Sequence, residues 1–217
     1  MNITILCTDP LHPVIPRIKA WVLPLIDDGH EVELIHDKLE LSEGDLLFLV
    51  SCSQLINEHD RSKYQSTLVI HASDLPKGRG WSPHIWQILE GRHQLTVSLL
   101  EAEEGVDSGD IWMQRVITLE GHELYHEINE KLFAAELWLM DFAVTSFDSV
   151  KPRPQACDQA SYYPKRTPAD SELDPDKTLS EQFDLMRVCD PERYPAFFKM
   201  NGCEYEVVLN KRVTNES

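Results

Sequence analysis

Four short segments with the pattern of strands in the N-terminal part of the chain constrain its fold more than any other feature. Residues 2–7, 45–50 and 67–70 are mainly apolar runs bounded by polar or turn-forming residues, as expected of buried strands, and residues 31–35 also read as a strand. A helical spacing of apolar residues over 16–28 separates the first two segments. Strands that alternate with helical connections predict an α/β protein with a mainly parallel, Rossmann-like sheet flanked by helices. No G-x-G-x-x-G motif follows the first run, so a dinucleotide site has no support.

The middle of the chain continues this alternation of strand and helix. A helix that starts at Ser82 or Pro83 ends at Gly91, and a further apolar run over 95–100 predicts another strand. A long helical pattern over 123–147 predicts a helix that covers one face of the sheet. These elements place the predicted main domain in residues 1–150.

The composition changes after this domain. Residues 151–176 contain five prolines and the aromatic pair Tyr162-Tyr163, which predicts a linker or a crossing segment. A short helical pattern covers 179–189, and residues 196–209, interrupted by Asn-Gly, predict a β-hairpin. We therefore expect a second part, over 151–217, made of a linker, a short helix and a C-terminal hairpin.

Charge and composition limit the classes of partner. The formal net charge of −17 argues against nonspecific binding to nucleic acid, which needs a basic face. No stretch approaches the ~20 apolar residues that span a bilayer, and the start lacks the basic region of a signal peptide. We therefore expect a cytoplasmic protein that binds no membrane. The five cysteines form no C-x-x-C pair and predict free, buried thiols. His122 and His126 have no evident third ligand, so no metal is expected.

Two side chains with acid-base chemistry follow the central predicted strands. His71 comes directly after the run over 67–70, at the carboxyl end of a parallel strand, where open α/β sheets bind ligands. Asp107 lies in the turn G-V-D-S-G-D after the next strand, and we expect it at the same edge of the sheet. A carboxylate beside an imidazole can fix its tautomer, and the pair can take and return a proton. A purely structural histidine is the alternative interpretation of His71.

The motifs around these two residues resemble the folate-dependent formyltransferases. The string H-A-S-D-L-P-K-G-R-G-W-S-P begins at His71, and E-A-E-E-G-V-D-S-G-D ends at Asp110. They carry most of the family pattern Asn-x-His-x-Ser, Leu-Pro, Arg-Gly and Asp-x-Gly, in that order. The likeness extends from residue 1 to about Leu209 and implies the formyltransferase fold, with residues 1–150 as its catalytic domain. It implies that the formyl group of N10-formyltetrahydrofolate passes to a primary amine without the help of a metal.

The resemblance also implies roles for individual residues. His71 would stabilise the tetrahedral intermediate and help to shuttle its proton, while Asp107 would orient His71 and accept a proton from the attacking amine. The folate would bind between two loops that offer mainly backbone groups, at Ser73, Asp74, Leu75, Pro76, Leu100, Gly105 and Val106. The acceptor would contact Lys77, Arg79, Trp81, Tyr162, Tyr163 and Lys165.

One departure from the family pattern concerns the residue two positions before the histidine. The family places an asparagine there, whose amide supports the oxyanion, and this chain has Val69. A valine side chain donates no hydrogen bond, so a backbone N–H, Ser51 or Ser53 takes over this role, or catalysis is weakened. Loss of one oxyanion donor lowers rates by ~10²–10³-fold. A folate-binding protein that has lost its activity therefore stays an alternative.

The short and acidic form of the chain is most similar to the nucleotide-sugar N-formyltransferases within this family. A methionyl-tRNA enzyme usually carries a further basic C-terminal domain, whereas this sequence ends soon after one hairpin. We therefore expect a nucleotide-linked amino sugar as acceptor, in surface-polysaccharide synthesis such as that of lipopolysaccharide O-antigen. Another small amine, such as a glycinamide ribonucleotide, is the alternative acceptor. A homodimer through the hairpin or the covering helix is also compatible with the sequence, as is an interaction subunit whose hairpin pairs with a partner.

Overall fold

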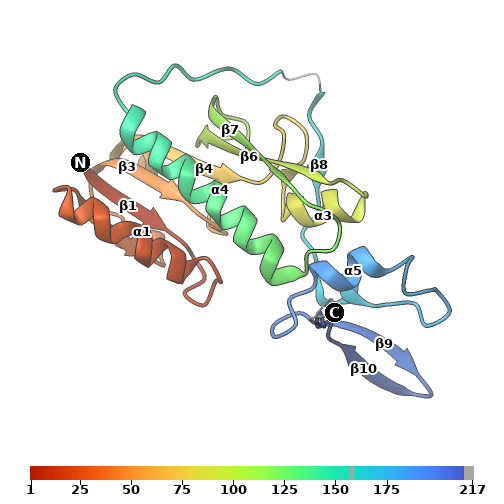
Figure 1. Cartoon of the computed structure of the whole chain (residues 1–217). Helices are drawn as coiled ribbons and strands as arrows, with labels where there is room; N and C mark the ends of the chain where they lie inside the picture. The colour runs from red at the N-terminus through yellow and green to blue at the C-terminus, as the bar shows by residue number, and fades with distance from the viewer. Residues whose placement is uncertain (157–158, 213–217) are drawn as a thin grey trace, which may run out of the picture.

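The computed structural model describes residues 1–156 and 159–212, and Figure 1 shows the arrangement of its elements. The helices are α1 (Ile15–Asp27), α2 (Glu58–Arg61), α3 (Pro83–Leu89), α4 (Tyr125–Ser146) and α5 (Phe183–Val188), with 3₁₀ turns η1 (Lys38–Glu40) and η3 (Pro168–Ser171). The strands are β1 (Asn2–Leu6), β2 (Glu31–Ile35), β3 (Gly44–Leu49), β4 (Tyr64–His71), β5 (Arg79–Gly80), β6 (Gln94–Glu101), β7 (Ile111–Thr118), β8 (Tyr162–Tyr163), β9 (Ala196–Met200) and β10 (Cys203–Val207).

The central sheet has the strand order β2-β1-β3-β4-β6-β7. The first four strands in this order pair in parallel, which confirms the predicted mainly parallel α/β sheet. β6 and β7 are antiparallel to their neighbours. β7 is absent from the sequence-based prediction because its side chains do not alternate strictly between buried and exposed.

Helices α1 and α4 cover one face of the sheet and the larger core, and a smaller apolar cluster lies on the other face. α4 packs on β6 and β7, α1 packs on β2, and the two helices contact each other in front of the sheet in Figure 1. Alternate strand residues such as Ile3, Ile5 and Phe48 face these helices and form the larger core. Their neighbours Leu6 and Leu47 face the other side, where they join a smaller cluster. This alternation follows from the period of two along a strand.

The C-terminal part forms its own small apolar cluster beside the main core. α5 and the hairpin β9–β10 lie together at one end of the molecule in Figure 1, around Leu173, Met186, Cys189 and Ala196. The hairpin turns at Asn201 and Gly202, which both have positive φ, as a two-residue hairpin turn requires. The predicted hairpin is therefore confirmed.

The helix before the hairpin is shorter than the pattern over 179–189 predicts. It begins at Phe183, because Glu181 accepts hydrogen bonds from both the N–H and the hydroxyl of Thr178 and closes a separate local turn. Leu179, where the predicted helix would begin, lies outside the helix and is exposed.

The segment between α4 and α5 is pinned at several points to the sheet and its loops. The main chain of Arg153 pairs with that of Ile111. Further along, β8 pairs in parallel with the two-residue strand β5, and Figure 1 shows β8 next to α3. This segment therefore crosses the molecule and contacts loops that are distant in sequence.

Within the part of the chain that the structure describes, Cys7, Cys52, Cys189 and Cys203 are free thiols, as predicted, and Cys157 lies outside that part. Cys7 and Cys189 are buried as expected, whereas Cys52 is half-buried and Cys203 is exposed. No helix among the described residues is both long and apolar enough to cross a bilayer. The described residues also contain no group of three or more His, Cys, Asp or Glu side chains that could hold a metal ion.

Candidate functional site

His71 is the last residue of β4 and its ring has an oxygen partner on each side. Its Nε2 lies 2.8 Å from the carbonyl oxygen of Gly78, and its Nδ1 lies 3.5 Å from Oδ2 of Asp107. The two side chains are only 7% and 10% exposed. Because a carbonyl oxygen only accepts hydrogen bonds, Nε2 carries a proton in this arrangement. A second proton on Nδ1 would face the carboxylate, so the site can hold an imidazolium with both N–H groups paired.

Asp107 reaches His71 by a different route from the one expected from the sequence. The expectation that it follows a parallel strand to the same sheet edge is wrong, because β6 runs antiparallel to β4 and ends opposite Leu68. The N–H of Ala102 still continues the ladder, since it donates to the carbonyl of Thr67. The loop beyond Ala102 then returns to β6, where the N–H of Glu101 donates to the carbonyl of Asp110, and it brings Asp107 to His71. Asp107 itself adopts a positive φ of 51° in this loop.

Two glycines allow the close backbone approaches that fix the Asp107 carboxylate. The N–H of Gly80 donates to Oδ2 of Asp107 at 2.9 Å, so the same oxygen faces both this N–H and His71. Gly80 has a φ of +98°, and a Cβ there would contact the carbonyl oxygen of Tyr163. A Cβ on Gly109 would collide with the carbonyl oxygen of Glu101. Side chains at these two positions are therefore incompatible with the observed loop.

The predicted folate-binding residues lie in the loop after β4 and the loop after β6, except that Leu100, expected in a loop, lies in β6 and pairs with Val69. Leu75 and Leu100 pack in one apolar cluster with Val69 and Ile111. Ser73 is buried, and its hydroxyl oxygen has no partner among the described residues. On the rim, Asp74 is exposed and accepts a 3.4 Å hydrogen bond from Gln114, Pro76 is half-buried, and Gly105 and Val106 are exposed.

The predicted acceptor-binding residues form two groups. Arg79 is buried and its guanidinium donates to the Tyr162 hydroxyl and to the side chain of Gln155, so it ties β5 to the crossing segment. The ring of Tyr163 stacks on Trp86, and its hydroxyl donates to Glu90.

The second group is accessible to solvent. Trp81 is partly exposed, and the Nζ of Lys165 lies 4.6 Å from the centre of its ring. Tyr162 keeps most of its surface exposed, and Lys77 is exposed on the loop between β4 and β5.

Val69 contributes only apolar surface next to the histidine. The two serines that could replace the family asparagine are not placed to do so by any hydrogen bond of the described residues. Ser53 shares a 3.0 Å hydrogen bond with the hydroxyl of Thr8, and the carbonyl of Ser51 accepts from the same hydroxyl.

Several contributors to the site were missed by the sequence analysis. The carbonyl of Gly78 and the N–H of Gly80 are backbone groups, which no residue pattern reveals. Ser161 accepts a 2.8 Å hydrogen bond from the N–H of Gly78 and therefore helps to orient the carbonyl that faces His71. Gln155 contacts both Arg79 and the loop of Asp107. Both side chains come from the proline-rich segment that the composition marks only as a linker.

A separate histidine adjoins this site. Burial, together with the neighbouring His12, His71 and Arg166, lowers the pKa of His84 to about 4. His84 is therefore neutral near pH 7 and lines a small cavity with Tyr125 and Asn129.

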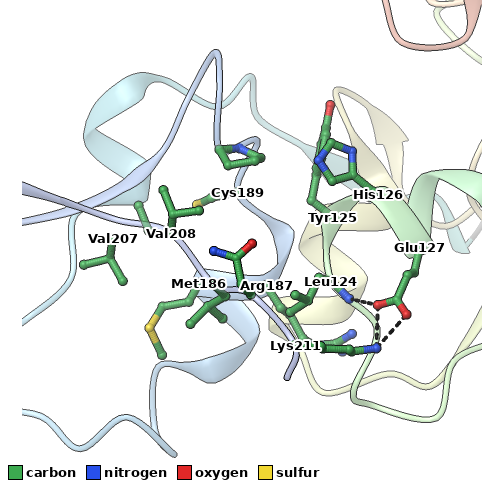
Figure 2. Close-up of a pocket in the computed structure, with 14 residues that line it drawn as sticks. Leu124, Tyr125, His126, Glu127, Met186, Arg187, Cys189, Val207, Val208 and Lys211 are labelled. Carbon is green, nitrogen blue, oxygen red and sulfur yellow. Dashed lines mark hydrogen bonds and ion pairs between the residues drawn. The ribbon is translucent and has the colours of Figure 1, made fainter. Parts of the chain in front are cut away.

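A pocket of about 250 Å³ lies away from His71, between the start of α4, α5 and the segment after β10. Figure 2 shows Met186, Cys189 and Val208 on one side of it, and the ion pair of Glu127 with Lys211 on the other. None of the predicted site residues lines this pocket.

Several known proteins similar to this chain are described as formyltransferases. The family model described as formyl transferase matches residues 28–144. A methionyl-tRNA formyltransferase from Protochlamydia amoebophila is 29% identical over 176 residues, which cover 78% of this chain and 54% of that protein. The one from Finegoldia magna is 32% identical over 101 residues, or 46% of this chain and 33% of that protein. The chain thus spans about half or less of the length of these curated relatives.

Solved structures with this fold carry different descriptions. A methionyl-tRNA formyltransferase from Clostridium thermocellum matches with a TM-score of 0.83 and 24% identity over 100% of this chain and 95% of that one. A sugar N-formyltransferase from Shewanella matches with a TM-score of 0.75 and 16% identity over 99% of both chains. HypX from Aquifex aeolicus in complex with tetrahydrofolic acid matches with a TM-score of 0.77 and 23% identity over 96% of this chain and 37% of that one. At these identities the structures show a shared fold. With the family model matched over more than half of its 217 residues, the chain belongs to the folate-dependent formyl transferase family.

Proposed function

We propose that the chain transfers the formyl group of N10-formyltetrahydrofolate to a primary amine, with His71 and Asp107 as its acid-base pair. The observation that carries this proposal is the buried approach of Nδ1 of His71 to Oδ2 of Asp107 at 3.5 Å. In the reaction, a bond forms between the amine nitrogen and the formyl carbon, and the bond from that carbon to N10 of the folate breaks. A proton leaves the amine and a proton reaches N10, so the site needs a group that can take and return one.

The contacts of the pair suit this task. Asp107 accepts from the Gly80 N–H and faces Nδ1 of His71, so its negative charge stabilises an imidazolium. The proton on Nε2 of His71 is bonded to the carbonyl of Gly78 in this structure, and it would serve the oxygen of the tetrahedral intermediate once that carbonyl is displaced. The loop of Ser73, Asp74, Leu75 and Pro76 and the positions Leu100, Gly105 and Val106 would hold the folate between them.

We propose a nucleotide-linked amino sugar as the acceptor. A net charge of −17 disfavours long-range attraction of a polyanion such as tRNA. The partly exposed Trp81 and Tyr162, with Lys165 beside Trp81, offer aromatic surface and a cation suited to a base and a phosphate of a nucleotide. Lys77, Arg79 and Tyr163 complete this proposed region.

Methionyl-tRNA is the second candidate acceptor, because the curated relatives cited above are described as methionyl-tRNA formyltransferases. The fold does not choose between the two, since structures described as either kind share it. Length does not choose either, because the Clostridium thermocellum chain is matched over 95% of its length.

The test is to measure tetrahydrofolate release from N10-formyltetrahydrofolate with a panel of acceptors. The panel contains nucleotide-linked 3-amino and 4-amino sugars, glycinamide ribonucleotide and methionyl-tRNA. We expect release with one nucleotide-linked sugar, loss of it in His71→Ala and Asp107→Asn, and no change in His59→Ala, which alters an exposed histidine on α2. Release with methionyl-tRNA alone would refute the sugar acceptor, and folate binding without release from any acceptor would refute the activity.

A further inference from the structure

Gln155 connects both sides of the candidate site. It lies in the crossing segment, outside the residues that the family model matches. Its side-chain amide donates to the carbonyl of Asp107 at 3.0 Å and to the carbonyl of Gly109 at 2.7 Å. Its amide oxygen accepts from Nη2 of Arg79 at 2.7 Å. One half-buried side chain therefore links the loop that carries Asp107 to the strand that carries Arg79.

With the peptide link from Arg79 to Gly80, these hydrogen bonds form a closed ring that runs from Asp107 through Gln155, Arg79 and Gly80 back to the Asp107 carboxylate. Arg79 precedes Gly80, whose N–H donates to Oδ2 of Asp107, and that oxygen faces His71. The main chain of Asp107 is held by Gln155, and its side chain is held by Gly80. Asp107 also has a positive φ, a conformation that a residue with a Cβ leaves readily when nothing holds it.

The guanidinium of Arg79 has few hydrogen-bond partners besides Gln155. Its Nη1 donates to the Tyr162 hydroxyl at 3.3 Å, and its Nε is buried without a partner among the described residues. The short bond to Gln155 is thus the strongest hydrogen bond that the described residues offer this guanidinium. The arginine and the Asp107 loop hold each other through Gln155.

We infer that Gln155 is a positioning residue that keeps the Asp107 carboxylate against Nδ1 of His71. The catalytic consequence rests on the proposed function, whereas the effect on the ring of His71 does not. Gln155 touches no reacting atom in this role and acts through Asp107. Removing its two donors lets the loop turn away, and His71 loses its anionic partner.

The experiment compares Gln155→Met with Gln114→Met. Methionine keeps the length of the side chain and removes its hydrogen bonds. Gln114 is the matched control because it also bridges two elements, from Arg153 to Ser98, and does not contact Asp107. The first readout is the ¹⁵N chemical shift of Nδ1 of His71 in the ligand-free protein, with Asp107→Asn as reference.

We expect the His71 signal of Gln155→Met to move most of the way to that of Asp107→Asn, and that of Gln114→Met to stay at the wild-type position. With an active acceptor, kcat of Gln155→Met falls by ~10²-fold, as for a misplaced catalytic group, and the KM for the acceptor changes little. In an Asp107→Asn background, Gln155→Met has no further effect on kcat, because the two residues act as one unit.

The inference would be overturned if folded Gln155→Met kept the wild-type chemical shift of His71 Nδ1. It would also be overturned if Asp107→Asn itself had the same shift as the wild type, because Asp107 would then not affect the ring. If Gln155→Met does not fold, Gln155→Glu replaces it, because it keeps the size of the side chain and the contact with Arg79 while turning its donors into acceptors. If no acceptor is turned over, the proposed activity fails and the His71 signal still decides the role of Gln155.

Discussion

Glu136 is an acidic side chain in the larger core and makes the stability of the fold depend on pH. It lies on α4, is 9% exposed, and its Oε2 has no partner among the described residues. Burial raises its pKa from 4.5 to about 8, so the folded protein keeps this carboxyl protonated at neutral pH. In the unfolded chain it ionises near its ordinary pKa. Its contribution to stability is therefore fully present below pH 4.5 and is lost as the pH rises toward 8.

The substitution Glu136→Gln removes this dependence. Each pH unit between the two pKa values is worth about 1.4 kcal/mol, so the wild type loses ~3 kcal/mol by pH 7 and ~5 kcal/mol by pH 9 relative to acid conditions. We expect the free energy of unfolding of the variant, minus that of the wild type, to rise by ~4 kcal/mol between pH 5 and pH 9.

Urea unfolding at pH 5, 7 and 9 measures this difference. Glu130→Gln is the control, because its side chain is on the same helix and is 67% exposed, and its difference from wild type should stay within about 1 kcal/mol at every pH. A flat difference for Glu136→Gln over this range would show that the carboxyl is ionised in the folded state and would refute the reasoning.

Three further predictions concern single residues. Val69→Asn should raise kcat with the acceptor found, by up to ~10²-fold in steady-state assays, because it adds a donor for the oxyanion. Burial of the new amide among leucines should lower stability by ~1–3 kcal/mol. An unchanged kcat would mean that another donor already serves the oxyanion. Gly109→Ala should lower the melting temperature and abolish turnover, because its Cβ collides with the carbonyl of Glu101, and a folded, active variant would contradict the described loop. Burial alone would raise the pKa of Glu123, but the hydrogen bonds from Lys131 and from backbone N–H groups lower it to about 2. Its contribution to stability is thus present above pH 4.5 and is lost toward pH 2, so Glu123→Gln should be destabilised at pH 7 by ~2–3 kcal/mol in urea unfolding and not at pH 2, and an equal effect at both would exclude this origin.

The parts of the fold that the sequence predicts are those in which burial alone determines the pattern. Strands β1, β3 and β4 contain short apolar runs because residues on both of their faces are buried. β2 lies at the sheet edge and keeps its glutamates exposed, and α4 shows its helical spacing because one side packs on the sheet. β7 lies at the sheet edge with only part of its length buried, so its pattern carries no clear period. The sequence also does not indicate the direction of β6, because an apolar run has the same pattern in a parallel and an antiparallel strand.

The candidate site shows the same division. The motif singles out His71 and Asp107, and the structure brings them together, although the expected route along a shared strand edge is wrong. The groups that hold them are the Gly78 carbonyl, the Gly80 N–H and the amide of Gln155. Two of these are backbone atoms, and the third comes from a segment whose composition indicates only a linker. Such partners are fixed by tertiary structure and leave no periodic signal in the chain.

Because Val69 offers no hydrogen-bond donor, the proposed chemistry requires the loop after β4 to move. The valine side chain packs with Leu75 and Leu100 and offers no hydrogen bond to an oxyanion. Under the proposed function, the Nε2–H of His71 is then the donor closest at hand, and in this structure it is already bonded to the carbonyl of Gly78. The formyl oxygen can take that proton only by displacing the carbonyl. Because Ser161 holds the N–H of Gly78 and β8 holds β5, the crossing segment resists this displacement. Ser161→Ala, which frees the N–H of Gly78, should therefore raise kcat if release of this carbonyl limits turnover, and a lower kcat would show that the carbonyl serves instead to hold His71 in place.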